Sequence, residues 1–179
     1  AYRTFSRLHP RHEQLDYAAY RVGLSLFKDA PSGIDRDQTN TERALEDFRR
    51  FLKDFPESAL AQEATDKMQQ GRQRLAEKEL YIGRFYYRRG NYRASIPRFS
   101  AVVERYPDSS VARETMLLLA KAYGLDGNDE KASDTLSEFL RRYESKDSLR
   151  DEAEELLRKQ RTPTQPTAAT DAALTPEAN

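Results

Sequence analysis

Ile82-Gly-Arg-Phe-Tyr-Tyr-Arg-Arg-Gly-Asn-Tyr92 returns 37 residues later as Leu119-Ala-Lys-Ala-Tyr-Gly-Leu-Asp-Gly-Asn-Asp129. Small, aromatic and glycine positions coincide between the two copies, and a large apolar side chain follows each at the same distance, at Phe99 and at Leu136. The Gly-Asn pair in each copy is typical of a helix that ends on a left-handed glycine before the next helix starts on an asparagine cap. A helix pair that recurs at a fixed shift predicts an array of stacked helical hairpins.

Both copies resemble the tetratricopeptide (TPR) repeat, in which small and large residues are placed at set positions on two antiparallel helices. Further copies of the junction between hairpins carry Pro10, Pro56 and Pro107. Proline cannot continue a helix and pushes the preceding residue out of the α region, so each proline marks a helix end. The sequence therefore predicts an all-α, TPR-type solenoid, and such solenoids usually act as binding surfaces.

The junctions are unevenly spaced. The three junction prolines are 46 and 51 residues apart, whereas a standard TPR repeat has about 34 residues. A turn-rich insertion, 29–38, lengthens the first interval. The second interval has no proline from Ser58 to Arg89, which predicts one long connecting helix of about 45 Å at ~1.5 Å per residue. The predicted helices are 1–8, 12–28, 41–55, 58–89, 91–105, 109–124, 129–143 and 147–160.

The C-terminal residues differ in composition from the rest of the chain. Residues 161–179 are rich in Thr, Pro and Ala and show no apolar periodicity. Such a segment cannot bury enough apolar surface to order itself. We therefore expect a TPR-type helical repeat domain over 1–160 and a disordered tail over 161–179.

Composition excludes several classes of function. Lys plus Arg and Asp plus Glu both number 30 and there is no cysteine, so no global basic field attracts nucleic acid and no thiolate can bind a metal. His9 and His12 lack a nearby carboxylate pair, and Asp35 and Asp37 are typical of turn and cap residues. No phosphate-binding loop or nucleophile motif occurs. We expect a non-enzymatic chain without cofactor or metal.

A longer series of motifs narrows the family. In chain order these are Leu15-Asp-Tyr-Ala-Ala-Tyr-Arg-Val-Gly-Leu24, Asp35-Arg-Asp37, Phe55-Pro-Glu-Ser58, the run from Leu75 to Tyr92, and Tyr106-Pro-Asp-Ser109. The series is similar to the BamD family, the TPR lipoproteins of the bacterial outer-membrane β-barrel assembly machinery. The resemblance extends over residues 1–158 and includes both the insertion and the long helix.

The resemblance implies a scaffold on the periplasmic face of the outer membrane, with its lipid anchor upstream of this chain. Members bind a POTRA domain of the barrel-forming subunit through C-terminal repeats, join other assembly lipoproteins, and meet unfolded outer-membrane proteins through N-terminal repeats. The alternative is a periplasmic TPR protein that coordinates cell-envelope or cell-division processes and shares the aromatic-Pro-x-Ser junctions. The insertion and the long helix argue against it.

The candidate partner-binding site is an arginine-rich group around the Gly90-Asn91 turn. Arginine pairs with carboxylates and stacks on aromatic rings, so such a group suits a protein interface, although a solvated charged face offset by glutamates would look the same. RNA binding is disfavoured because the chain is neutral and lacks a nucleic-acid motif. The predicted partner-binding residues are Arg84, Arg88, Arg89, Tyr92, Arg93 and Arg98.

The resemblance also implies that Arg98 lies at the POTRA contact, because an arginine follows the Arg-Gly-x-Tyr turn on the next helix in the family. The family often has asparagine before that arginine, whereas this chain has Pro97. Pro97 removes a backbone hydrogen bond to Arg93, which predicts either a tolerated kink or a bend that aims Arg98 at a partner. The aromatic and apolar residues nearby are expected in the core: Tyr81, Phe85, Tyr86, Phe99, Val102 and Val103.

Overall fold

The computed structural model describes residues 2, 4, 8 and 12–161. Every element that it assigns there is an α-helix: α2 (Leu15–Asp29), α3 (Thr39–Asp54), α4 (Ala61–Arg88), α5 (Tyr92–Arg105), α6 (Ala112–Leu125), α7 (Asp129–Arg142) and α8 (Ser148–Arg161). The predicted all-α class is confirmed. The predicted helix 1–8 lies largely outside the described residues. The predicted tail also does, apart from Arg161, at which α8 ends.

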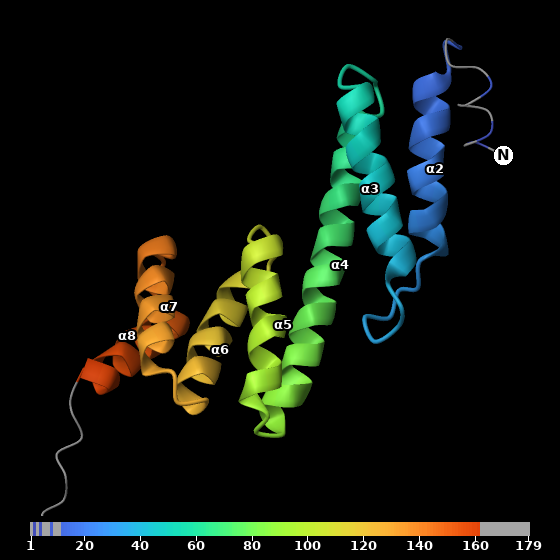
Figure 1. Cartoon of the computed structure of the whole chain (residues 1–179). Coiled ribbons are helices and arrows are strands. Elements are labelled where there is room, and N and C mark those ends of the chain that lie inside the picture. The colour runs from blue at the N-terminus through green and yellow to red at the C-terminus, as the bar shows by residue number, and fades with distance from the viewer. Residues whose placement is uncertain (1, 3, 5–7, 9–11, 162–179) are drawn as a thin grey trace, which may run out of the picture.

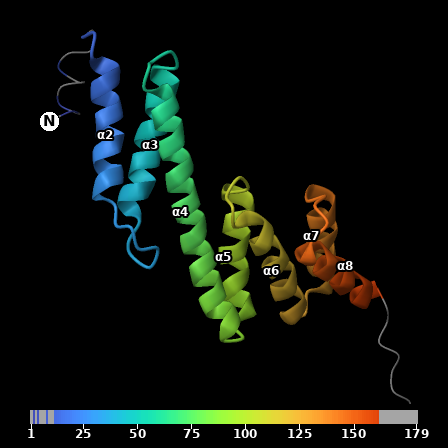
Figure 2. The same cartoon turned by 180° about the vertical axis from the view of Figure 1, so that it is seen from behind.

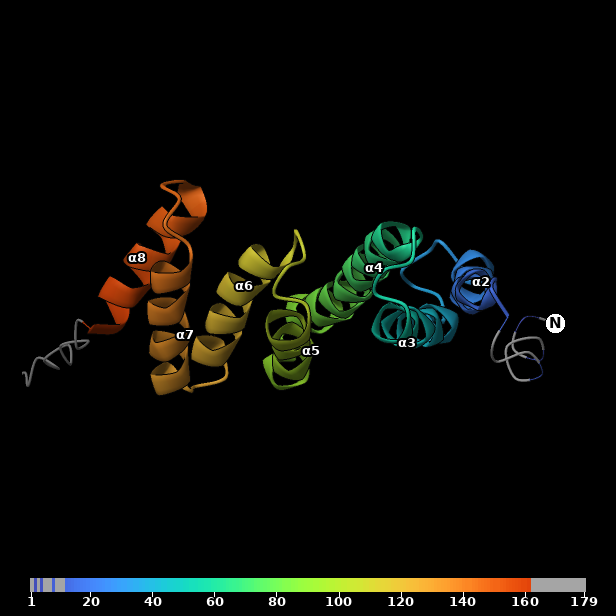
Figure 3. The ribbon, with the colours of Figure 1, turned by 90° about the horizontal axis from the view of Figure 1, so that it is seen from above.

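The helices form consecutive antiparallel hairpins in two layers (Figures 1 and 2). Seen from above, α2, α4, α6 and α8 make one layer and α3, α5 and α7 make the other (Figure 3). Each helix packs most closely against the helices that precede and follow it in the chain. Because contacts are made mainly between consecutive helices, with a few between the alternate helices of one layer, the described part of the chain is a solenoid, as predicted.

Helix α4 is the longest element described, with 28 residues, about 42 Å at ~1.5 Å per residue. Its first half contributes Ala64 to a core cluster with α2 and α3. Its second half contributes Ala76 and Leu80 to another cluster with α5 and α6. The predicted long connecting helix is therefore confirmed, and it is shared by two separate cores. A third cluster joins α6, α7 and α8.

Close helix packing inside the hairpins depends on glycine. A Cβ atom built at Gly83 of α4 would lie 2.4 Å from Cε1 of Phe99 in α5. Phe99 itself is fully buried. At the equivalent place in the first hairpin, a Cβ at Gly23 would lie 2.9 Å from the Phe48 ring. The small residue of the repeat thus leaves room for the large aromatic residue of the partner helix.

The two Gly-Asn turns form as predicted. Gly90 and Gly127 have φ values of 72° and 80°, in the left-handed region that favours glycine. Asn91 then accepts a hydrogen bond from the backbone N–H of Ala94 at 3.1 Å, and Asn128 accepts one from Lys131 at 3.1 Å. The asparagine side chains therefore satisfy a free N–H at the start of α5 and of α7.

At the junctions that contain Pro56 and Pro107, the next helix begins later than predicted. We expected helices to start at residues 58 and 109, but α4 starts at Ala61 and α6 at Ala112. The N–H of Ser58 donates to the Phe55 carbonyl at 3.2 Å and the N–H of Ala61 donates to the Ser58 carbonyl at 2.9 Å. Two successive turns therefore precede the helix. The predicted starts were wrong because serine here is a turn residue and not the helix cap.

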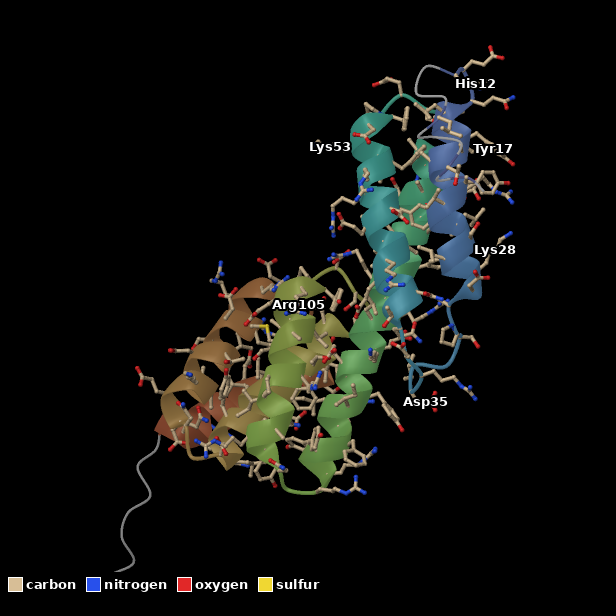
Figure 4. All side chains as sticks on the ribbon, turned by 45° about the vertical axis from the view of Figure 1, so that its right-hand side comes forward. His12, Tyr17, Lys28, Asp35, Lys53 and Arg105 are labelled. Carbon is tan, nitrogen blue, oxygen red and sulfur yellow. The ribbon has the colours of Figure 1, made fainter. Side chains whose placement is uncertain are left out.

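The insertion is an ordered loop held by one buried side chain. Gln38 is fully buried; its amide donates to the Gly33 carbonyl at 2.8 Å and accepts from the Thr41 hydroxyl at 2.7 Å. Asp37 accepts from the N–H of Thr39 at 3.0 Å and from its hydroxyl at 2.7 Å, which starts α3 two residues before the predicted position. Asp37 is thus a turn residue, one of the two roles predicted for it, and the N-cap position of α3 is occupied by Gln38. Asp35 lies in this loop, and Figure 4 shows that Asp35 and Lys53 are at opposite ends of the α2–α3 hairpin.

Two arginines clasp neighbouring hairpins together. Arg72 of α4 donates to the Asp108 carboxylate at 2.5 Å and to the Arg105 carbonyl at 2.8 Å, across the α5–α6 junction. Arg113 of α6 makes the same contact one junction later, with the Asp147 carboxylate at 2.7 Å. The hydrogen bond from each arginine is the main cause that lowers the pKa of the Asp108 and Asp147 carboxyl groups.

The Arg72–Asp108 and Arg113–Asp147 contacts, here called the clasps, are expected to make a pH-dependent contribution to the free energy of unfolding. A carboxyl group whose folded pKa is lowered stabilises the fold above its unfolded pKa of about 3.9, and this contribution is lost as the pH falls through the folded pKa. We expect the Asp108→Asn/Asp147→Asn variant to melt at a lower temperature than the wild type at pH 6, and the gap to close as the pH falls below about 4.

The control variant is Asp54→Asn/Asp134→Asn, at exposed carboxyl groups for which no hydrogen bond or ion pair to a described residue is found. Its melting temperature should follow that of the wild type at each pH. A gap for the clasp variant that stays constant from pH 6 down to pH 2 would contradict the assignment.

Candidate partner-binding surface

The predicted arginine-rich group surrounds the α4–α5 turn but separates into two sets. Arg84 and Arg98 lie away from the turn and are ion-paired inside the molecule. Arg88, Arg89 and Arg93 lie at the turn and are exposed. The first set is bound to neighbouring helices, and the second set remains available to a partner.

The paired set ties helices together. Arg84 of α4 forms an ion pair with Glu114 of α6. Arg98 of α5 forms an ion pair with Glu79 of α4, with an N–O distance of 3.1 Å. The Arg98 side chain is 45% exposed, and ion pairs at exposed sites contribute only ~0–1 kcal/mol to stability. A partner carboxylate can therefore compete for Arg98 at small cost.

The free set carries an aromatic contact. For Arg88, Arg89 and Arg93, no ion pair with any described residue is found. The Arg89 guanidinium lies 3.6 Å from the centre of the Phe85 ring. Stacking orders the guanidinium and leaves its N–H groups free for a carboxylate. This combination of an ordered arginine and an exposed aromatic ring is typical of protein interfaces.

Tyr92 is mainly a packing residue. Its ring packs edge-on against Tyr87, with the ring centres 5.3 Å apart, and the side chain is half-buried. Burial raises the pKa of the Tyr87 phenol, with Tyr92 adding a smaller effect in the same direction. Tyr92 therefore supports the base of the turn, and its predicted role in partner binding remains a prediction.

The prediction that Tyr81 and Phe85 are core residues was wrong: their exposed fractions are 46% and 40%. The hairpin before α4 ends too early to cover them. Phe27, near the end of α2, reaches α4 at Arg74, whose guanidinium lies 5.1 Å from the ring centre. Figures 1 and 2 show that α4 continues well beyond that hairpin. Of the other expected core residues, Phe99 and Val102 are buried, and Tyr86 and Val103 are half-buried.

Pro97 lies inside α5, which runs from Tyr92 to Arg105 without a break. Both Pro97 and Arg93, whose carbonyl loses its helical donor, are exposed, so water can take the place of the missing N–H. The helix also has support at its start, because the Ser95 hydroxyl donates to the Tyr92 carbonyl at 2.8 Å. Helix α5 is therefore continuous through Pro97, and the bend that would aim Arg98 at a partner stays a prediction.

The α6–α7 turn was predicted as a turn but not as part of a candidate binding surface. Leu125 is 55% exposed, and Asp126, Asp129 and Glu130 are exposed with no ion pair to the described residues. The signal was present in the repeat, because Tyr92 in the first copy is replaced by Asp129 in the second. The replacement of a half-buried tyrosine by an exposed aspartate at the aligned position indicates that the two turns present different surfaces.

The described surface also contains a hollow of about 740 Å³ in the α2–α3 hairpin, lined among others by Val22, Leu26, Arg43, Asp47 and Arg50. Apolar side chains come from α2 and charged ones from α3. This arrangement would suit an extended segment with apolar and polar side chains on alternate sides. Within the described residues, no helix combines the length and the apolar character needed to span a bilayer.

Comparisons with known proteins agree with the fold. A family model described as outer membrane lipoprotein (YfiO) matches residues 1–140. The outer membrane protein assembly factor BamD of Neisseria meningitidis serogroup A is 32% identical over 140 residues, which cover 73% of this chain and 52% of the relative. Proteins of the same name from Caulobacter vibrioides and Vibrio cholerae are 34% and 32% identical over 128 residues, covering 72% and 66% of this chain.

The chain spans about half the length of the curated relatives that it matches, with 42% of the Caulobacter protein and 53% of the Vibrio protein covered. The region matched by the family model ends at residue 140 and so contains the insertion loop, α4 and both Gly-Asn turns. The candidate surface therefore lies entirely within the matched region.

Proposed function

The chain belongs to the YfiO family of outer membrane lipoproteins, the family of the assembly factor BamD, and on that premise we propose that it is a non-enzymatic scaffold in outer-membrane protein assembly. It acts at the periplasmic face of the outer membrane, where it joins other assembly lipoproteins. Its C-terminal hairpins bind a POTRA domain of the barrel-forming subunit. The observation that carries this proposal is the group of exposed arginines at the α4–α5 turn, for which no ion pair to a described residue is found.

Binding at this surface requires no catalytic step, because it depends only on complementary charge and shape. Arg88, Arg89 and Arg93 offer several guanidinium groups in one place, and Arg98 can exchange Glu79 for a partner carboxylate. Arginine is well suited to such contacts because its planar fork pairs with a carboxylate through two hydrogen bonds. An acidic patch on the POTRA domain is therefore the expected counterpart.

Replacing Arg98 by alanine tests the proposal. The variant removes one carboxylate-binding group, and we expect it to weaken binding of the purified POTRA domain about fivefold, which is ~1 kcal/mol. Affinity is measured by biolayer interferometry, and helicity by circular dichroism. Alanine is preferred to glutamate because glutamate would place a second carboxylate beside Glu79, which is only 20% exposed.

The matched control is Glu79→Gln, which breaks the same internal ion pair but leaves Arg98 in place. We expect this variant to bind the POTRA domain as tightly as the wild type or more tightly. If both variants lose affinity and helicity to the same degree, the ion pair is structural and Arg98 is not a binding residue.

Unfolded outer-membrane proteins are the second class of partner in this proposal, and the hollow between α2 and α3 supports it. Its apolar residues, Val22 and Leu26, come from one helix, and charged residues come from the other. Affinity purification from outer-membrane extract separates this function from the alternative. Recovery of the barrel-forming subunit supports assembly, whereas recovery of cell-division or peptidoglycan proteins supports a coordinating role in the envelope.

A further inference from the structure

The α4–α5 and α6–α7 turns lie at the same edge of the solenoid (Figures 1 and 2). They occupy equivalent positions in the two repeats, with Gly90 in one turn and Gly127 in the other. Helices α5 and α6 pack directly against each other between them. The two turns therefore flank this packed helix pair, with the end of α4 in one turn and the start of α7 in the other.

The charges at the two turns are opposite. The first turn carries Arg88, Arg89 and Arg93, and the second carries Asp126, Asp129 and Glu130, all of them exposed. No ion pair joins any of these six side chains to a described residue. Although the chain has a net charge of zero, this edge has a strong separation of charge between neighbouring hairpins.

Each turn also presents one large apolar side chain beside its charges. Phe85 is 40% exposed on α4 and Leu125 is 55% exposed at the end of α6. An apolar contact surrounded by charged groups is the usual composition of a protein interface, in which the apolar part supplies affinity and the charges supply orientation. The two turns therefore form one surface with two matched halves.

We propose that this dipolar edge, made by both turns, is a single docking surface for a folded partner face that carries an acidic patch and, beside it, a basic patch. The proposal rests on the proposed function, and the occupant to which it commits is the POTRA domain. The acidic turn then fixes the direction in which that domain lies along the solenoid. An anionic membrane is disfavoured as the occupant because the acidic turn would repel it.

The decisive experiment reverses the charge of the acidic turn. The variant Asp126→Lys/Asp129→Lys/Glu130→Lys is titrated with the purified POTRA domain by biolayer interferometry. A dipolar partner should bind this variant about tenfold more weakly than the wild type. A uniformly acidic partner should bind it more tightly, because three repulsive groups have become attractive, and that result would overturn the proposal.

Two further variants control for helix destabilisation and for the change in net charge. Asp129 and Glu130 lie in the first turn of α7, where acidic side chains favour the helix. The neutral variant Asp126→Asn/Asp129→Asn/Glu130→Gln perturbs that turn less, and it should still lose about threefold in affinity. The control, Glu57→Lys/Glu104→Lys/Glu144→Lys, changes the net charge equally at exposed residues near the junctions of the opposite edge. It should bind at least as tightly as the wild type.

The remaining outcomes distinguish the two proposals. If the wild-type chain fails to bind the POTRA domain, the proposed function fails and the inference fails with it. If the wild type binds and the acidic-turn variants keep full affinity, only the inference is overturned. A dimer of the wild type in sedimentation velocity that the acidic-turn variant abolishes would assign the edge to a second copy. Wild-type binding to anionic vesicles that strengthens in this variant would assign it to a membrane.

Discussion

The Phe48→Ala variant is expected to lose about 3–5 kcal/mol of unfolding free energy, the usual cost of truncating a buried phenylalanine. Phe48 is fully buried in the cluster formed by α2, α3 and the first half of α4. Its ring centre lies 5.8 Å from that of Tyr20 and 6.2 Å from that of Phe27. Close packing leaves these rings little freedom to fill the cavity, so the loss should fall near the upper end of the range.

The loss should also be local, because each hairpin contacts only its neighbours. Hydrogen exchange measured by mass spectrometry is expected to show lost protection in α2, α3 and the start of α4, while α7 and α8 keep theirs. Tyr17→Ala is the control on the same hairpin; Tyr17 is 44% exposed, and its removal should change stability by no more than about 0.5 kcal/mol. Equal loss of protection along the whole chain would show instead that the solenoid unfolds as one unit.

Gly83→Ala is expected to destabilise the protein by about 1–3 kcal/mol, the cost of overpacking a core, even though alanine favours a helix. The new Cβ would meet two atoms of the buried Phe99 ring at 2.4 and 2.6 Å. At Gly124 the same substitution would meet its nearest atoms at 3.6 and 3.8 Å, which is ordinary contact. Gly124→Ala should therefore stabilise the protein by about 0.5–1 kcal/mol.

Chemical denaturation measures both substitutions, and a second-site change tests the cause. Phe99→Leu should cost stability alone but should remove most of the additional loss caused by Gly83→Ala, because the ring that meets the new Cβ is gone. The coupling energy from the double-mutant cycle is expected to be about 1 kcal/mol or more. Additive effects of the two substitutions would mean that the helices separate freely and that Gly83 does not set their distance.

Features that depend on local geometry were predicted well. A left-handed glycine followed by an asparagine cap is determined by a few adjacent residues, and Gly90 and Gly127 adopt that geometry. The length of α4 follows from the absence of proline and from an unbroken apolar pattern. The helix starts at Ser58 and Ser109 were predicted wrongly because serine is equally typical of turns and caps.

Features that depend on neighbouring hairpins were predicted poorly. Tyr81 and Phe85 lie at helical spacing from core residues, but their exposure depends on where the preceding hairpin ends along α4. The internal ion pairs of Arg84 and Arg98 likewise depend on Glu114 and Glu79, which lie on other helices. The position of the arginine-rich turn is therefore predictable from the sequence, whereas the division into arginines with and without an ion pair to a described residue depends on the tertiary structure.

The sharing of α4 by two cores has a geometric consequence. Ala64 packs with the first hairpin and Leu80 with the next, on one uninterrupted helix. Each residue added to an α-helix turns everything after it by about 100° and moves it by ~1.5 Å. The number of residues between these two contacts therefore sets the rotation of one half of the solenoid relative to the other. A single insertion near Gly71 would point the dipolar edge in a new direction, whereas the loop 30–38 could change length without rotating anything beyond it.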